Sequence, residues 1–404
     1  MFNPLDFIFK KRVTSVLGID IGTSSIKIVE LRRESNSHFN LLNYAVLAPK
    51  RSPGDESVRG LLFDLEEARI AQYIKFLIKE SGFTTDTAVM SLPIFSTFVT
   101  IMEMPILDEK AMANAVPLQA REYIPIPISE VVLDWKIVET TKKSDLTRAE
   151  PALPNSLTDQ SPRTQNVGGA MTMEEKNAST QSQKETPSFS PKHQGTKVLL
   201  MAAPRDMVQK YVRIAQLSEL TLMGLEIESF ALARAGALDE KTAVLLLDMG
   251  AFSSSIAVFD EGSLRIAHHV GIASSDFTRA CSRALGTDME RAESYKQTFG
   301  LYASGGEKEI VTAYLPLLEA LAREVERVMS AYWKTSSRQI TRLILSGNTA
   351  LLRGLDEYFA SRLRLSVQTV SPFSHISLPK DLVPVSGLIG PELANAAGLA
   401  MKEI

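Results

Sequence analysis

The sequence predicts a two-lobed α/β fold, because the same short motif stands at the head of two halves of similar order. The segments Val16–Leu31 and Val244–Phe259 each consist of an apolar run, the triplet Asp-x-Gly, a small hydroxyl-bearing turn and a second apolar run. Strands and helices are expected to alternate after each of them. This arrangement indicates an internal structural repeat rather than a sequence repeat.

Each of these motifs is typical of a tight β-hairpin whose turn carries backbone N–H groups and hydroxyls. Gly22 and Gly250 permit a positive φ and a close approach to a ligand, and successive N–H groups in such a turn form a concave anion site. Asp20 and Asp248 precede the turns and are placed to hold Mg²⁺, directly or through water, beside a bound phosphate. Two facing hairpins would clamp a nucleoside triphosphate. Two ordinary hairpins are the alternative, which explains one copy well and the matched pair poorly.

The candidate phosphate-contacting residues all lie in or beside these two turns. Lys27 has two possible roles. It either contacts phosphate or is an ordinary surface residue of a strand, and the second interpretation is favoured. The candidates are Gly22, Thr23, Ser24, Ser25, Lys27, Gly250, Ala251, Phe252 and Ser253.

Two further elements fit a nucleotide site. The segment Arg342–Phe359 is expected to form a strand, a small-residue turn through Gly347, Asn348 and Thr349, and a helix whose N-terminal amides face a ligand. Glu293 and Lys296 lie three residues apart and share one face of a predicted helix. They either reach a ligand or form a solvated surface ion pair. Together, this order of motifs resembles the actin–Hsp70–sugar-kinase superfamily, in which the third element is the adenosine loop and the matching Glu and Lys reach the ribose and base of ATP.

Composition excludes several classes of protein. The chain has 404 residues, 45% of them hydrophobic, and a net charge of 44 − 47 = −3, so it has more than one domain and presents no basic face for nucleic acid. Its single cysteine, Cys281, is expected to be buried and inert and fits a reducing cytoplasm. No apolar run approaches the length of about 18 residues that a membrane span requires. Residues 1–12 are expected to be a frayed tail.

Residues 141–196 are dominated by Ser, Thr, Gln, Pro, Asn and Lys, with Phe189 as the only aromatic residue. Such a segment cannot bury enough apolar surface to offset its ordering entropy, so we expect disorder. The flanking segments 131–138 and 197–203 are both predicted strands, which makes the segment an insertion in a hairpin. The remaining predicted elements are strands at 87–92 and 98–103 and helices at 68–80, 108–123, 204–216, 229–237, 290–298 and 315–334.

Three segments, 104–135, 198–208 and 224–234, resemble the signature of the PilM family, and the resemblance runs from about residue 13 to 402 apart from the insertion. It implies an actin/Hsp70-like (ribonuclease H-like) fold with the subdomains of FtsA. The implied divisions are a tail (1–12), 1A (13–91 and 226–240), 1C (92–225, with the insertion 141–196), 2A (241–270 and 341–404) and 2B (271–340).

The resemblance implies an ATP-binding cytoplasmic scaffold of type IV pilus assembly, or of a related secretion or competence machine. Its implied partner is the N-terminal tail of a PilN-like inner-membrane protein, held in a groove between 1A and 1C, so that contact with the membrane is only through the partner. Other pilus motor components and self-association are further implied contacts. The candidate groove residues are Tyr123, Ile124, Ile126 and Ile128, whose alternative role is to fill the 1C core.

Whether the cleft hydrolyses ATP depends on Glu228, which stands where MreB and Hsp70 relatives place an acidic residue that faces the γ-phosphate. It is the candidate for positioning water, and its alternative is a carboxylate favoured by the helix dipole. Any turnover is expected to be slow. Competing functions are an FtsA-like filament-forming ATPase in cell division or shape, a small-molecule kinase, for which no acceptor motif with an Asp base is found, and an Hsp70-like chaperone, for which no C-terminal peptide-binding domain is expected.

Overall fold

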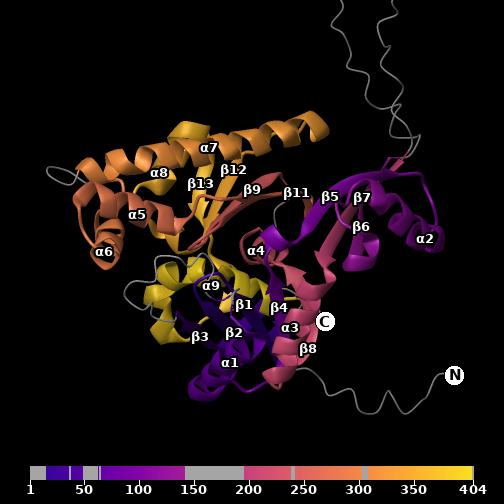
Figure 1. The fold of residues 1–404 in the computed structure, drawn as a ribbon, viewed down its shortest axis with the longest axis horizontal. Coiled ribbons are helices and arrows are strands. Elements are labelled where there is room, and N and C mark those ends of the chain that lie inside the picture. The colour runs from indigo at the N-terminus through magenta and orange to yellow at the C-terminus, as the bar shows by residue number, and fades with distance from the viewer. Residues whose placement is uncertain are drawn as a thin grey trace, which may run out of the picture.

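The structure is a computed structural model that describes residues 15–35, 38–48, 62, 65–141, 195–237, 242–302 and 308–402. The predicted tail 1–12 and nearly all of the predicted insertion lie outside these ranges. Figure 1 shows two stacked lobes with a third, smaller unit beside them. The predicted two-lobed α/β architecture is confirmed.

The first lobe is built on a six-stranded sheet that is covered on both faces. Helices α1 (Glu67–Ser81) and α3 (Arg205–Leu217) pack against one face, and α9 (Ser386–Ala400) packs against the other. Its strands are, in spatial order, β14 (Ile376–Ser377), β3 (His38–Leu47), β2 (Ile26–Ser35), β1 (Ser15–Ile21), β4 (Thr87–Leu92) and β8 (Thr221–Ile227).

The second lobe repeats this plan with a five-stranded sheet. Because side chains alternate along a strand, Leu245 and Leu247 of β9 enter the core on one face, while Val244 and Leu246 face α4 (Glu228–Gly236) on the other. Its strands are β11 (Ser263–Val270), β10 (Ser254–Asp260), β9 (Val244–Met249), β12 (Arg342–Ser346) and β13 (Ser366–Thr369). Helices α5 (Ser274–Leu285), α6 (Met289–Phe299), α7 (Lys308–Ser336) and α8 (Leu355–Leu363) complete this lobe.

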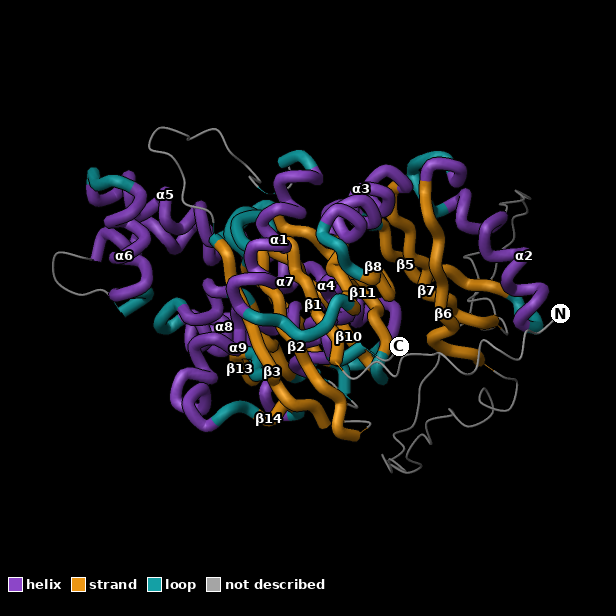
Figure 2. Tube along the Cα trace, turned by 90° about the horizontal axis from the view of Figure 1, so that it is seen from below, coloured by secondary structure: helices purple, strands orange, loops and turns teal. Residues whose placement is uncertain are grey.

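The third unit, called the β5–β7 unit below, is a three-stranded antiparallel sheet in the order β5 (Phe98–Met104), β7 (Gly195–Pro204) and β6 (Val131–Thr141). The pairing of β6 with β7 confirms the predicted hairpin on either side of the insertion. Helix α2 (Glu109–Gln119) covers one face of this sheet, and Leu199 on the other face joins the core around α4. Figure 2 shows the strands of this unit beside those of the first lobe.

Several elements differ from the sequence prediction. Helix α7 begins at Lys308 rather than at residue 315 and continues through Pro316, because its buried face from Ile310 to Tyr332 packs along the second lobe. Helix α2 ends at Gln119, and a 3₁₀ turn (Ala120–Glu122) follows it. The sequence analysis gave no bounds for β3, β8, β11, β13, β14, α5 or α9.

Packing also refines the subdomain boundaries. The predicted 1C range, 92–225, includes α3 and most of β8, which the structure places with the first-lobe sheet. The predicted return to 2A at 341–404 includes β14 and α9, which likewise pack against first-lobe strands. Within the described ranges, no helix is long and apolar enough to cross a lipid bilayer.

Candidate functional site

All candidate residues predicted for phosphate, metal, ribose and base line one cavity of about 1370 Å³ between the two lobes. The turn after β1 and the turn after β9 approach it from opposite lobes, and the segment after β12 completes its wall. The residues that converge there are Asp20, Gly22, Thr23, Ser24, Ser25, Lys27, Glu228, Asp248, Gly250, Ala251, Phe252, Ser253, Glu293, Lys296, Gly347, Asn348 and Thr349.

The two turns are closed by the same backbone hydrogen bond. Gly22 N–H donates to the Ser25 carbonyl and Gly250 N–H to the Ser253 carbonyl, both over 3.0 Å. Neither glycine has a positive φ, so that part of the expectation is wrong. The need for glycine is steric, because a Cβ at Gly250 would lie 2.8 Å from the Ser253 carbonyl oxygen.

Lys27 reaches into the cleft and does not merely decorate a strand. Its ammonium donates to Asp20 over 3.2 Å, and the Lys27 side chain is 15% exposed. Burial alone would lower the pKa of Lys27, but the Asp20 carboxylate, helped by Asp248 and Glu392, raises it above its usual value. Asp20 also accepts from the Ser91 hydroxyl over 2.8 Å. The first turn therefore carries an Asp20–Lys27 ion pair, whose charged ammonium lines the cleft and could donate to an anion.

Asp248 in the second turn has neutral partners. Asn395 of α9 donates to it over 3.0 Å. Burial, and then the Asp20 charge, raise the pKa of Asp248, against the Asn395 hydrogen bond. Gly347 lies against this carboxylate with φ = 80°, and a Cβ there would be 2.5 Å from the Met249 carbonyl oxygen, so this position requires glycine on both grounds.

Glu228 begins α4 and lies at the back of the cleft. Its carboxylate accepts from the Ile94 N–H over 3.3 Å. Burial, followed by the charges of Asp248 and Asp20, raises the pKa of Glu228 to about 8. The cleft thus concentrates negative charge that a cation would relieve. The described residues contain no cluster of three or more His, Cys, Asp or Glu side chains suited to a metal.

Glu293 and Lys296 form the predicted ion pair on α6, at 2.7 Å, but it is not a solvated one. Lys296 is 4% exposed and donates to Ser274 and Thr278 as well. Burial lowers the pKa of Lys296, while for Glu293 the effect of burial is outweighed by Lys296, which lowers the Glu293 pKa. Both pKa shifts agree with the geometry, because Lys296 is the more deeply buried partner and Glu293 the more exposed one. Glu293 is the half-exposed group that faces the cleft.

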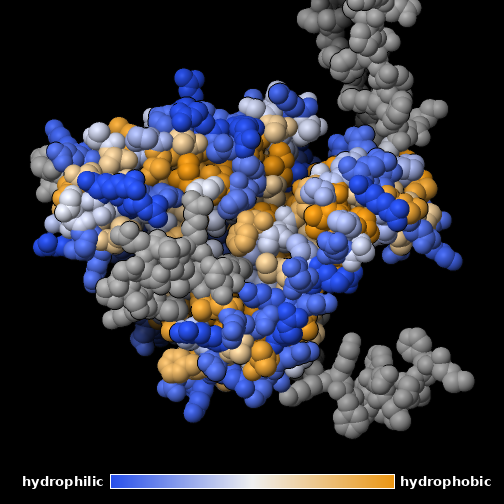
Figure 3. Space-filling model, viewed as in Figure 1, coloured by the Kyte–Doolittle hydropathy of each residue, from blue (hydrophilic) through white to orange (hydrophobic). Residues whose placement is uncertain are grey.

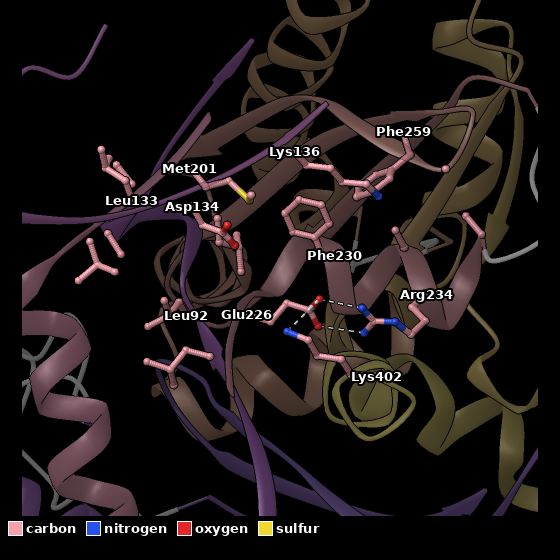
Figure 4. Close-up of a pocket in the computed structure, with 18 of the residues that line it drawn as sticks. Leu92, Leu133, Asp134, Lys136, Met201, Glu226, Phe230, Arg234, Phe259 and Lys402 are labelled. Atoms are coloured by element: carbon pink, nitrogen blue, oxygen red, sulfur yellow. Dashed lines mark hydrogen bonds and ion pairs between the residues drawn. The ribbon is translucent and has the colours of Figure 1, made fainter. Parts of the chain in front are cut away.

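A second cavity, of about 640 Å³, lies outside the cleft between the β5–β7 unit and α4. Figure 4 shows Leu92, Leu133 and Met201 on one side of it and Phe230 at its centre. We call it the groove. A charged cluster closes one end of the groove. There Arg234 donates from its two terminal guanidinium nitrogens to Glu226, over 2.7 and 2.9 Å, and Lys402 lies 3.8 Å from the same carboxylate.

The predicted groove segment does not line this cavity. Ile124 is 6% exposed in the core under α2, where Tyr123 and Ile128 also pack, and Ile126 is 39% exposed. Sequence reasoning missed the lining residues on α4 and β8, although the segment 224–234 had stood out as a signature. Figure 3 shows apolar side chains exposed over the β5–β7 unit. Val132 of β6 is 39% exposed and lines the groove.

Two lobes with matched hairpins that face a shared cleft define the actin-like class. A family profile described as "Type IV pilus assembly protein PilM" matches residues 18–150 and 186–404. The chain therefore belongs to the PilM family.

Two solved structures are similar in fold. A chain of a PilM–PilN type IV pilus biogenesis complex is 23% identical, with 96% of this chain and 97% of that one covered and a TM-score of 0.70. The ethanolamine utilization protein EutJ from Carboxydothermus hydrogenoformans is 16% identical, with 96% and 89% covered and a TM-score of 0.51.

Proposed function

We propose that this chain is an ATP-binding scaffold of type IV pilus assembly that recruits the N-terminal tail of a PilN-like inner-membrane protein. Membership of the PilM family supports the setting. The observation that carries the proposal is the coexistence of two separate cavities, a polar cleft with paired anion-binding turns and an apolar groove beside it. A scaffold needs both, because one site receives the nucleotide and the other receives the partner.

In the cleft, the turn amides and Lys27 would receive the phosphates, and Gly347 to Thr349 would lie against the adenosine. Asp20 and Asp248 would hold Mg²⁺ through water, and the ion would neutralise phosphate charge. Without a bound cation, Glu228 would be largely protonated at pH 7, since burial and the charges of Asp248 and Asp20 raise its pKa to about 8. A protonated carboxylic acid cannot accept a proton from water, so Glu228 could act as a base only once a cation had offset the two aspartate charges.

In the groove, an extended peptide with apolar anchors would replace water along Leu133, Met201 and Phe230. The groove is lined by β6 and β7 of the β5–β7 unit, by β8 and α4, and by Val244 and Phe259 of the second lobe. Because the PilN-like protein is anchored in the inner membrane, its tail would hold this chain at the cytoplasmic face of that membrane. The 23% identical PilM solved with PilN supports the choice of partner.

The test is calorimetric titration with a synthetic peptide of the N-terminal cytoplasmic residues of PilN, and separately with Mg-ATP. Val132→Asp should abolish peptide binding and leave ATP binding intact. Its control, Ile137→Asp, alters a similarly exposed residue of the same strand that does not line the groove. Asp20→Ala and Asp248→Ala should each weaken Mg-ATP binding. Unchanged affinity in both Asp variants would contradict the clamp, and equal losses in Val132→Asp and Ile137→Asp would contradict the groove.

A further inference from the structure

Strand β8 leaves one edge of the first-lobe sheet unpaired among the residues that the structure describes. It stands last in the order of six strands, and β4 is its only partner among the described strands. Such an edge offers backbone N–H and C=O groups to another segment, and proteins usually block it with Pro, Lys or a covering element. The sequence of β8 contains neither Pro nor Lys, and Met223 on it is 42% exposed. An extended segment can therefore add to this edge.

The same strand leads into the groove, because Leu225, Glu226 and Ile227 at its end are lining residues. We propose that residues 1–12 of this chain, the tail, dock on β8 as an added antiparallel strand, and that their first residues enter the groove. In that position the tail competes with the partner peptide. The competition rests on the proposed function, whereas the docking on β8 does not.

The direction and reach of the tail follow from the start of β1. Leu17 of β1 and Leu222 of β8 both stand beside Ala88 of β4, and both strands run parallel to β4, so Ser15 lies at the end of the sheet where β8 begins. A segment that approaches Ser15 along the edge of β8 therefore runs antiparallel to β8. The position of an added strand is three strand spacings from β1, about 14 Å. About four extended residues cross that distance, so about ten remain to lie along β8.

The composition of the tail matches this path. Its basic residues come shortly before Ser15 and would cross the end of the sheet where β8 begins, and acidic side chains stand there. Asp86 is exposed beside Thr221, and the side chain of Glu219, which also pairs with Lys75, is 81% exposed. Pro4 is compatible with the added strand, because that strand would itself form the new edge. The basic residues are Lys10, Lys11 and Arg12, and the apolar residues are Phe2, Leu5, Phe7, Ile8 and Phe9.

The apolar residues of the tail would meet apolar side chains along the whole path. They would pass Met223 and then reach the end of β8, where the groove begins. Figure 4 shows Leu92, Leu133 and Met201 around the groove, with Glu226 at its charged end. The partner peptide would contact the same walls, so the two segments exclude each other. The apparent affinity for the partner peptide is then reduced by the fraction of time that the tail leaves the groove open.

The docking is tested by cross-linking in the full chain with a short bismaleimide, in the absence of partner peptide. Phe7→Cys is combined with Met223→Cys, and in the control with His38→Cys. The native Cys281 is buried, so it does not react. His38 is a matched control because it is exposed, lies two strands from β1 on the other side and is at the same end of the sheet as Ser15. A tail without a docking site would reach both positions.

The docked tail gives an intramolecular cross-link to Met223→Cys and little or none to His38→Cys. Equal yields at the two positions overturn the docking, and so does a product that joins two chains, which denaturing gel electrophoresis separates by size. Addition of the PilN peptide should lower the yield at Met223→Cys, because it displaces the tail. A yield that saturating peptide leaves unchanged overturns the competition.

The competition is measured by calorimetric titration of the full chain with the PilN peptide. Leu5→Asp removes an apolar residue that would enter the groove and should raise the affinity about tenfold, if the tail covers the groove about nine-tenths of the time. Asn3→Asp adds the same charge, keeps every apolar residue and should leave the affinity at the wild-type value. Equal affinities in Leu5→Asp and the wild type overturn the competition. Absence of peptide binding in all three proteins refutes the proposed function, and the cross-link still decides on the docking.

Discussion

The crossing of α4 and α9 predicts opposite effects for the same substitution at two positions of one helix. Gly398 and Gly387 both belong to α9. Gly398 is buried against α4, whereas a Cβ at Gly387 would meet nothing within 4 Å. Gly398→Ala should destabilise the protein, and Gly387→Ala should stabilise it.

The magnitudes follow from two competing terms. Alanine in place of glycine favours a helix interior by about 1 kcal/mol, and by about half of that near an end. At Gly398 the added methyl would lie 1.9 Å from the Ala231 carbonyl oxygen and 2.5 Å from its carbon. These are backbone atoms and cannot rotate away, so the overpacking cost lies at the upper end of its range, about 3 kcal/mol. Gly398→Ala should therefore lose about 2 kcal/mol of unfolding free energy.

Urea denaturation followed by far-UV circular dichroism measures both variants beside the wild type. The midpoint should fall for Gly398→Ala and rise slightly for Gly387→Ala, with the slope unchanged. If Gly398→Ala proved as stable as Gly387→Ala, α9 would not be in backbone contact with α4 at Gly398.

Three further predictions concern single side chains. Because the pKa of Glu228 is raised from 4.5 to about 8, the folded state binds this proton more tightly than the unfolded state, and its contribution to stability is lost as the pH rises through about 8. Glu228→Gln should therefore gain stability over the wild type at pH 9 but not at pH 4, and parallel gains at both values would contradict the assignment. Arg364, the exposed residue that follows α8, has φ = 56°, so Arg364→Gly should raise the unfolding free energy by about 1 kcal/mol; a loss in thermal melts would refute this. Lys296→Met should lower the melting temperature more than it weakens ATP binding, because the ammonium is spent on Ser274, Thr278 and Glu293; a selective loss of ATP affinity would show direct contact with nucleotide.

The features that sequence reasoning predicted well are local. The two hairpins and the strand–turn–helix after Arg342 form where an apolar run meets a glycine-containing turn, and this pattern depends on neighbouring residues alone. That these segments meet at one cleft was predicted because the two hairpin motifs have the same sequence pattern, and the structure shows them lining one cavity. The buried state of Cys281 followed from residue type and is confirmed.

What escaped prediction depends on contacts between distant segments. Helix α9 contains Gly387, Gly390, Pro391 and Gly398, a composition that is typical of a loop. Gly398 stands in this helix because α4 approaches it so closely that only a residue without a side chain fits there. The groove was missed because its walls come from β4, β6, β7, β8, β9, β10 and α4, which only the fold brings together.

The two Asp-x-Gly hairpins are alike in sequence but differ in charge. Across the ladder from Asp20 stands Lys27, whereas Ser255 stands across from Asp248. Both oxygens of Asp20 are engaged, one by Ser91 and one by Lys27, while Asp248 has only neutral donors. Because Mg²⁺ requires carboxylate oxygens that are not already paired with a cation, we expect the ion nearer to Asp248. Lys27 would then turn from Asp20 towards the phosphates, so the matched motifs would perform two different tasks, one as the cation side of the clamp and one as the metal side.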